Sequence, residues 1–390
     1  MKKLLTILLV LTAVKINAQW IEVYSASGTR AIYGVYFASP DVGWITGNGG
    51  TIKKTTNSGY NWISQDIGLN IELNNLYFIN ENTGMVFGQK CSAYKTTNGG
   101  VSWNLKFNDT TSSQLFFIAN HFVNSMTGYA VGHEIIKTTN GGEIWTNQSF
   151  PLDTPKKGYR AVNFINDQTG WIVGYTTHGI ILKTTNGGIN WIQQSVIDSV
   201  SLQYVKFFNS STGIISGNLT DGSGVSKFYK TTNGGGSWNL FSTITTGTIN
   251  SGGTFFMNEN IGLTIIKNSP GPNRIYKTTD GGANWNYQTF SQSLWNIFFT
   301  NNSLGWIVGG GSPLEYVLKT TNGGNVFINN NSNEIADKFS LSQNYPNPFN
   351  PATIINYQLT INSFVTLNVY DINGRLVKEL VNEKQNAGNY

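Results

Sequence analysis

Residues 183–191 read KTTNGGINW, and this stretch decides the fold because close copies of it recur along the chain. The copies begin at seven lysines spaced 41 to 47 residues apart: Lys54, Lys95, Lys137, Lys183, Lys230, Lys277 and Lys319. Repetition at such a period is typical of solenoids, propellers and other arrays in which one unit stacks on the next.

Each copy occupies the same place in a unit of four short apolar runs. The second run starts with glycine, as in GWIVG at 170–174, and the third leads into Lys-Thr-Thr. Four such runs separated by Gly and Asn turns predict one antiparallel blade. A lone four-stranded sheet cannot bury both faces, whereas seven sheets arranged radially can. The sequence therefore predicts an all-β fold, a seven-bladed β-propeller over residues 19–328, with the first strand of each blade lining the axis.

Two segments compete to complete the ring. Residues 20–23 (WIEV) form a strand-like run ahead of the first unit, while residues 327–331 follow the last copy and make a poor strand. We expect residues 20–23 to be the outer strand of the last blade. Closure in sequence order by residues 327–331 is the alternative.

The repeated turn is interpreted as structural, because a reactive site occurs once and this motif occurs in every unit. Its Asn or Asp is expected to accept backbone N–H groups two residues on, its Gly to take a positive φ, and its aromatic residue to anchor the outer strand. The opening lysine is expected to lay its stem along such a ring with the charge outward. The predicted turn residues are Asn57, Trp62, Asn98, Trp103, Asn140, Trp145, Asn186, Trp191, Asn233, Trp238, Asp280, Trp285, Asn322 and Phe327.

Composition excludes several classes of protein. The 390 residues include 11 Trp, 18 Tyr and 22 Phe, too many aromatic residues for a disordered chain. Residues 1–18 have the basic start, short apolar core and small final residue of a signal peptide. Without its three lysines the net charge falls from +5 to about +2, which gives no argument for nucleic acid. The single cysteine, Cys91, excludes an intrachain disulfide.

The motif resembles the Asp-box or BNR repeat, with Thr and Asn in place of the usual Ser and Asp except at Asp280. The fuller pattern is similar to the propellers of photosystem II assembly factors and sortilin-like proteins. This resemblance implies the fold, and little about function, because sialidases, xyloglucanases, assembly factors and receptors share the repeat.

A second resemblance covers residues 339–390. Residues 339–351 read FSLSQNYPNPFNP, and an Asp-x-x-Gly-Arg element follows at 371–375. The segment is similar to the C-terminal sorting domain of the type IX secretion system, an immunoglobulin-like β-sandwich of Bacteroidetes-type bacteria. The family continues with further strands, so we expect a truncated, incomplete sorting domain after a linker at 329–338. The resemblance implies the type IX machinery as a partner.

The search for chemistry yields no metal, cofactor or phosphate-loop pattern, since the three histidines lack ligand spacing. A glycosidase would need two facing carboxylates. The acids mapped to the face opposite the repeated turns stand in no motif: Asp66, Glu72, Asp109, Glu134, Asp153, Asp198, Asp221 and Glu315.

The three arginines of the propeller, Arg30, Arg160 and Arg274, map to that same face. With Lys156 and Lys157 they are predicted to bind an anionic ligand or an acidic partner. Among the tryptophans, only Trp295 falls outside the expected core positions. The prediction is a secreted or cell-surface, non-enzymatic propeller that binds a protein or polysaccharide. It is expected neither to bind nucleic acid nor to be an integral membrane protein. A secreted glycoside hydrolase and an envelope assembly or scaffold factor are the alternatives.

Overall fold

The computed structural model describes residues 20–27, 30–109, 115–148, 158–245, 251–267, 272–311, 314–324, 340–341, 344, 353–359, 363–371, 375–385 and 388–390. The chain divides into two compact units: Ala18–Val326 is one, and Phe327–Tyr390 belongs to the other. The predicted linker at 329–338 lies outside the described residues, as do residues 1–18 and Phe327.

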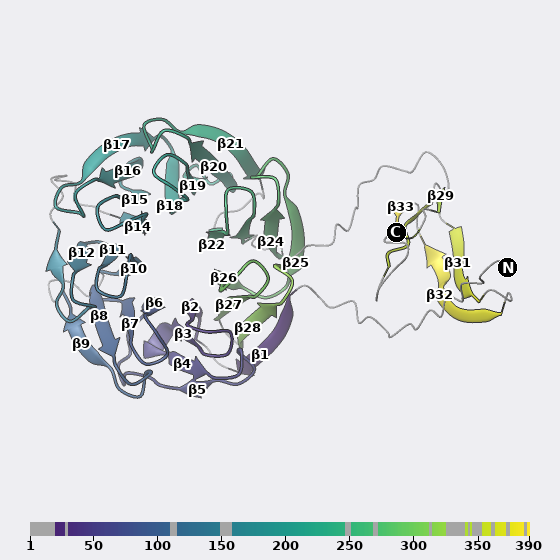
Figure 1. Ribbon diagram of the computed structural model, residues 1–390, viewed down its shortest axis with the longest axis horizontal. Coiled ribbons are helices and arrows are strands. Elements are labelled where there is room, and N and C mark those ends of the chain that lie inside the picture. Colours follow the sequence, from purple (N-terminus) through teal and green to yellow (C-terminus); the bar gives the residue numbers. More distant parts are fainter. Residues whose placement is uncertain are drawn as a thin grey trace, which may run out of the picture. The chain divides into compact units, whose positions relative to one another are not determined.

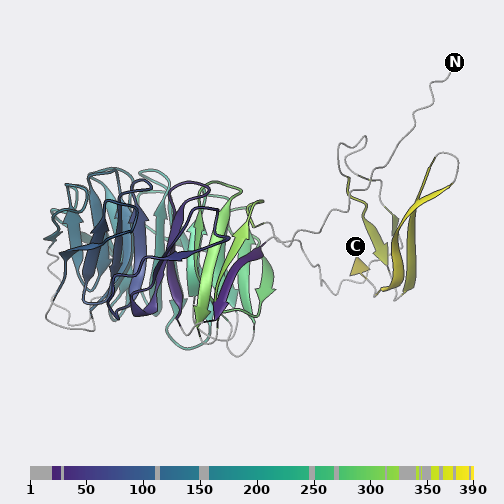
Figure 2. The same ribbon diagram turned by 90° about the horizontal axis from the view of Figure 1, so that it is seen from below.

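The first unit is a seven-bladed β-propeller, and its strands run between two faces of a disc (Figures 1 and 2). The innermost strands are β2 (Ile32–Phe37), β6 (Leu73–Phe78), β10 (Phe117–Phe122), β14 (Gly158–Phe164), β18 (Val200–Phe207), β22 (Ser251–Phe256) and β26 (Leu294–Phe299). The second strands are β3 (Gly43–Gly47), β7 (Gly84–Gly88), β11 (Gly128–Gly132), β15 (Gly170–Tyr175), β19 (Gly213–Leu219), β23 (Gly262–Ile266) and β27 (Gly305–Gly311).

The two remaining layers complete each antiparallel sheet. The third strands are β4 (Ile52–Thr55), β8 (Ser92–Thr96), β12 (Ile135–Thr138), β16 (Gly179–Thr184), β20 (Val225–Thr231), β24 (Asn273–Thr278) and β28 (Leu314–Thr320). The outer strands are β5 (Ile63–Ser64), β9 (Asn104–Phe107), β13 (Thr146–Asn147), β17 (Ile192–Ile197), β21 (Asn239–Thr245), β25 (Asn286–Phe290) and β1 (Ile21–Ser27). A three-residue 3-10 helix, η1 (Asn48–Gly50), is the only helix among the described residues, so none of their helices could cross a membrane.

The second strands are buried along all or nearly all of their length because each blade is covered on both faces by its neighbours. Continuous apolar runs such as GWIVG suit such a strand. The glycine that opens the run leaves room for the phenylalanine that ends the inner strand. A Cβ on Gly170, for example, would lie 2.5 Å from the Phe164 ring.

Neighbouring blades are joined by aromatic stacking. Phe207 at the end of β18 stacks on Trp171 of the preceding blade, with ring centroids 3.4 Å apart. Its other contact is edge-on to Trp238, the tryptophan of its own turn, at 5.8 Å. The same face-to-face stacking occurs in Trp44–Phe78, Tyr129–Phe164 and Trp306–Phe37. Each aromatic pair of this kind contributes about 0.5–1.5 kcal/mol beyond its buried area.

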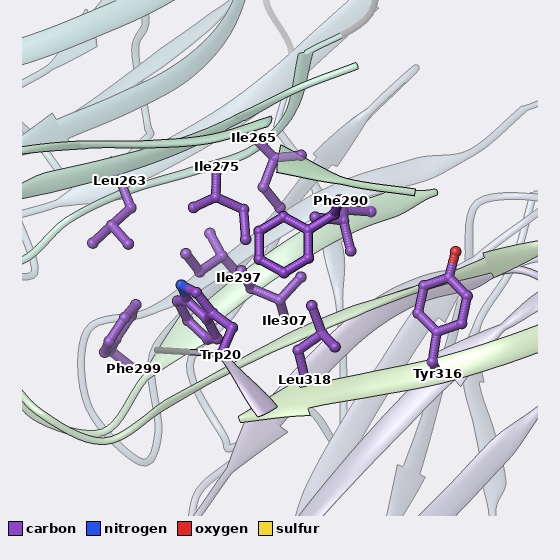
Figure 3. Close-up of a cluster of buried hydrophobic side chains, with 11 residues drawn as sticks. Trp20, Leu263, Ile265, Ile275, Phe290, Ile297, Phe299, Ile307, Tyr316 and Leu318 are labelled. Carbon is purple, nitrogen blue, oxygen red and sulfur yellow. The ribbon is translucent and has the colours of Figure 1, made fainter. Parts of the chain in front are cut away.

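The ring is closed by the N-terminal strand. Strand β1 pairs antiparallel with β28 from Ile21–Lys319 to Ser27–Leu314, so the outer strand of the seventh sheet precedes the first sheet in sequence (Figure 1). Trp20 meets the edge of Phe299 at 5.8 Å, as Trp191 meets Phe164 at 5.8 Å. Trp20 thus has the packing position of a motif tryptophan, among Leu318 and other side chains of the last two sheets (Figure 3).

The second unit is also all-β in its described parts. Strands β29 (Ser340–Leu341), β30 (Tyr357–Leu359) and β33 (Gly388–Asn389) form one sheet, and β31 (Ser363–Tyr370) pairs with β32 (Leu376–Gln385). The Asp-x-x-Gly-Arg element closes this hairpin, because Asp371 Oδ1 accepts a hydrogen bond from the Arg375 N–H at 2.9 Å.

Candidate functional site

The repeated turns are held by a small side-chain network. In the fourth copy Thr184 Oγ1 donates to Asn186 Oδ1 at 3.0 Å and accepts from the Gly188 N–H at 2.9 Å. Asn186 Oδ1 also accepts from the Asn190 N–H at 2.9 Å. The expectation of a bond two residues on is therefore wrong: the bond reaches four residues on, because two positive-φ glycines fold the backbone back over the side chain.

The motif lysines point into the next blade. Lys183 Nζ lies over the Trp171 ring and donates to the Gly234 carbonyl of the following turn at 3.0 Å. Lys277 donates in the same way to Gly323 at 2.9 Å. Burial lowers the pKa of both lysines. The stem lies along the ring as expected, but the outward charge is wrong: the ammonium group bridges two blades through the turn carbonyl, and the Gly234 carbonyl also accepts from Trp171 Nε1 at 3.3 Å.

The face opposite these turns carries a repeated irregularity. Each innermost strand has a β-bulge near its start, which leaves one residue, or two in β22, outside the register with the second strand. Bulges of this kind re-aim side chains and are frequent near functional sites. We call the residues at this position the bulge ring: Tyr33, Asn74, Ile118, Arg160, Gln203, Gly252, Gly253 and Trp295.

The bulge ring surrounds one mouth of the axial channel, because the innermost strands line the axis. Arg160 is the exposed cation of this ring. No Asp or Glu of the described residues forms an ion pair with it. Nearby protein atoms partly desolvate the Arg160 guanidinium and lower its pKa, but arginine remains charged at physiological pH. Arg160 therefore presents an unneutralised positive charge beside the channel.

The other two predicted arginines are engaged within their own blades. Arg30 Nη1 donates to Thr51 Oγ1 at 3.1 Å and lies 3.6 Å from the Asp66 carboxylate. Arg274 lies over the Tyr287 ring, 4.7 Å from its centroid, and donates to the Tyr276 hydroxyl. That hydrogen bond raises the pKa of Arg274. The structure gives each arginine separate partners and no contact with another arginine among the described residues. Lys156 and Lys157 lie outside the described residues.

An aromatic pair flanks the arginine-bearing mouth. Trp295 and Tyr33, bulge residues of adjacent blades, meet edge to face with centroids 5.2 Å apart. Trp295 Nε1 donates to the Gly310 carbonyl at 3.0 Å, and Lys267 Nζ lies over the indole ring. Burial lowers the pKa of Lys267 to about 7. Sequence reasoning singled out Trp295 and missed Tyr33 and Lys267; alignment of the seven first strands would have placed Tyr33 beside it.

The candidate carboxylates are dispersed. Glu315 pairs with Lys53 and accepts from the Tyr24 hydroxyl at 3.0 Å. Asp198 lies 2.9 Å from His178 Nδ1, and Asp66 faces Arg30. Each of these acids has a basic side chain as its described partner instead of a second facing carboxylate. Asp153 lies outside the described residues, and no cluster of three or more His, Cys, Asp or Glu suited to a metal occurs among the described ones.

Two protein-family models match the sequence. Residues 108–254 match the photosynthesis system II assembly factor YCF48 model, and residues 343–389 match the secretion system C-terminal sorting domain model. Both resemblances drawn from the repeats and from the C-terminal segment are confirmed. The sorting-domain match implies a secreted or cell-surface protein that the type IX machinery handles. No curated protein matches the sequence.

Solved structures share the propeller fold. YCF48 from Cyanidioschyzon merolae is 16% identical, with a TM-score of 0.61 over 79% of this chain and 100% of that one. A YCF48 bound to D1 peptide is 17% identical, with a TM-score of 0.59 over 79% and 96% of the two chains. The GH74 enzyme of Niastella koreensis is 16% identical, with a TM-score of 0.56 over 76% of this chain and 53% of that one. At such identities the likeness shows the fold alone.

Proposed function

We propose that the chain is a secreted or cell-surface, non-enzymatic propeller that binds a protein or polysaccharide at the bulge-ring face. The observation that carries the proposal is Arg160, a cation at the mouth of the channel that forms no ion pair with a carboxylate of the described residues. An exposed guanidinium offers up to five hydrogen-bond donors to carboxylates of a ligand.

The aromatic pair of Tyr33 and Trp295 supports this proposal. Aromatic rings with one wet edge are enriched at binding surfaces, where they supply contact area at little entropic cost. An acidic polysaccharide or an acidic protein surface would use both features: negative groups for Arg160 and apolar faces for the rings. The YCF48 structure with D1 peptide is a propeller of this fold bound to a peptide.

Export belongs to the same proposal. Residues 1–18 would direct the chain to the periplasm, and the C-terminal unit would then hand it to the type IX machinery. Glycoside hydrolysis is the second candidate, favoured by the fold shared with the GH74 enzyme. An envelope assembly or scaffold factor is the third, favoured by the YCF48 model match.

The test uses the propeller, a panel of neutral and uronate-containing polysaccharides, and both binding and product release as readouts. Arg160→Ala should weaken binding of the acidic members about tenfold, the loss of one charge-assisted contact, without lowering the thermal midpoint. Lys230→Ala, a motif lysine beside a repeated turn at the opposite face, is the control. Unchanged binding in Arg160→Ala and in the triple variant with Arg30→Ala and Arg274→Ala would reject the binding face. Product release that disappears on substitution of a face carboxylate would establish the hydrolase instead.

A further inference from the structure

The axial channel holds a cavity of about 380 Å³, deeper than the bulge ring. Residues that come after the bulge in each innermost strand line this cavity. One lining position recurs in every blade, immediately before the phenylalanine that ends the innermost strand: Tyr36, Tyr77, His121, Asn163, Lys206, Phe255 and Phe298. Because each comes from the same register position of a different blade, the seven form a single layer around the axis. The cavity volume is within the range of small-molecule sites.

This layer has two chemically different arcs. Blades six, seven, one and two contribute Phe255, Phe298, Tyr36 and Tyr77, an aromatic arc in which Tyr36 lies 4.9 Å from Phe298 and 5.3 Å from Tyr77. Blades three, four and five contribute His121, Asn163 and Lys206, a polar arc. A ligand in the cavity would therefore meet an apolar wall on one side and a cation on the other.

Lys206 is the charged group of the polar arc. None of the described residues that line the cavity is Asp or Glu, and Lys206 has no ion pair among the described residues. Burial lowers the pKa of Lys206, and burial together with the nearby Lys206 charge lowers the pKa of His121 to about 4. His121 is therefore neutral near pH 7 and does not compete with Lys206 for an anion.

A second polar residue that lines the cavity has a hydrogen-bond donor without a partner among the described residues. Asn120 Nδ2 is buried without a hydrogen bond, whereas the neighbouring Asn75 and Asn296 amides donate to the Ile118 and Tyr33 carbonyls. A buried donor without an acceptor costs about 1–3 kcal/mol. A buried charge without a counter-ion costs at least as much. An oxyanion placed within reach of Lys206 would remove the second of these costs.

We infer that this cavity binds a small monocarboxylic acid with an apolar or aromatic body. A single carboxylate balances the single positive charge of Lys206, whereas a dianionic phosphate would leave one negative charge uncompensated. The aromatic arc takes the body of the acid. This inference concerns the channel interior and does not rest on the macromolecular partner proposed for the bulge-ring face.

The test measures binding of 3-phenylpropionate to the full chain by calorimetry and by the shift of the thermal midpoint. We expect the acid to raise the midpoint, since a ligand that binds the folded state stabilises it. Lys206→Met keeps the apolar stem and removes the charge, so it should raise the dissociation constant at least about tenfold. Lys227→Met, a partly buried lysine on a third strand outside the cavity, is the matched control and should leave binding unchanged.

Three further measurements decide the chemistry. The neutral 3-phenylpropanol and inorganic phosphate should both bind more weakly than the acid. Tyr77→Leu should weaken binding of the acid in the wild type and in Lys206→Met alike. Phosphate binding as tight as that of the acid, equal binding in wild type and Lys206→Met, or no binding to the wild type would each overturn the inference. Arg160→Ala should leave binding of the acid unchanged, which separates this site from the proposed face.

Discussion

Single side chains in this propeller have more than one way to fasten a blade to the next. Most motif lysines that have a described partner in the next blade donate a hydrogen bond to a turn carbonyl, as Lys183 does. Lys95 instead binds the Glu143 carboxylate at 2.7 Å. Lys106 binds the other oxygen of Glu143 at 2.6 Å. These two hydrogen bonds, Lys106 first, lower the pKa of Glu143 to about 2.

Glu143→Gln should therefore lower stability in a pH-dependent manner. The folded-state pKa of the carboxyl is below its unfolded value, so its contribution is complete above about pH 4.5 and is lost as the pH falls toward 2. Because the Glu143 side chain is 46% exposed, we expect a loss of about 1 kcal/mol or less at pH 7. Urea unfolding of both proteins across this pH range measures the difference. A difference that is independent of pH and of added salt would contradict the electrostatic explanation.

At the scale of the element, the turn between the third and outer strands is stabilised by its threonine and its asparagine together. The two threonines of each motif differ sharply: Thr184 is buried within the network, while Thr185 is exposed. The pair forms an internal comparison, because both are adjacent β-branched residues with a hydroxyl.

Thr184→Val should cost about 1–3 kcal/mol, since the buried Gly188 N–H loses its acceptor and Asn186 loses a donor. Thr185→Val is the control and should change the free energy of unfolding by less than about 0.5 kcal/mol. Denaturant midpoints of the two variants provide the measurement. Equal losses would show that the hydroxyl network does not stabilise the turn.

For the whole molecule, the last blade differs from the other six because it joins the two ends of the propeller, β1 and β28. At its junction with the first blade lies an ion pair between the partly buried Lys53 and the buried Glu315, to which Tyr24 is hydrogen-bonded. Burial would lower the pKa of Lys53, but its hydrogen bonds with Glu315 and Tyr24 outweigh burial and raise it. The stability associated with this shift is present below pH 10.5 and is lost as the pH rises through the higher folded-state pKa.

Trp20→Ala should loosen the attachment of β1 in the last blade, where Trp20 packs among side chains of the last two sheets. Removing a fully packed tryptophan costs about 3–5 kcal/mol, and here the lost contacts include Phe299 and Gly324. Ile21→Ala, at the adjacent and partly exposed position, is the control and should cost much less. The free energy of unfolding is the measured quantity. A Trp20→Ala loss no larger than that of the control would mean that the ring closes without this tryptophan.

The sequence by itself determined the all-β class, the seven blades, the order of strands within a blade and the C-terminal sorting domain. It could do so because those features follow from local patterns: a period of 41 to 47 residues, glycine-opened apolar runs and one turn motif. The closing strand could also be predicted, because Trp20 and the run after it have no place in the four-strand pattern of the first blade.

Only the tertiary structure decided which side chains meet. The stacking of Phe207 on Trp171, the reach of Lys183 to the next turn and the single layer that contains His121 and Lys206 all depend on the register between sheets. The three arginines illustrate the limit: strand order assigned them to one face, but the separate partners of Arg30 and Arg274 follow from exact distances across and between strands. Periodicity specifies how often a residue recurs, whereas contacts depend on the curvature of the ring and on bulges that no local pattern encodes.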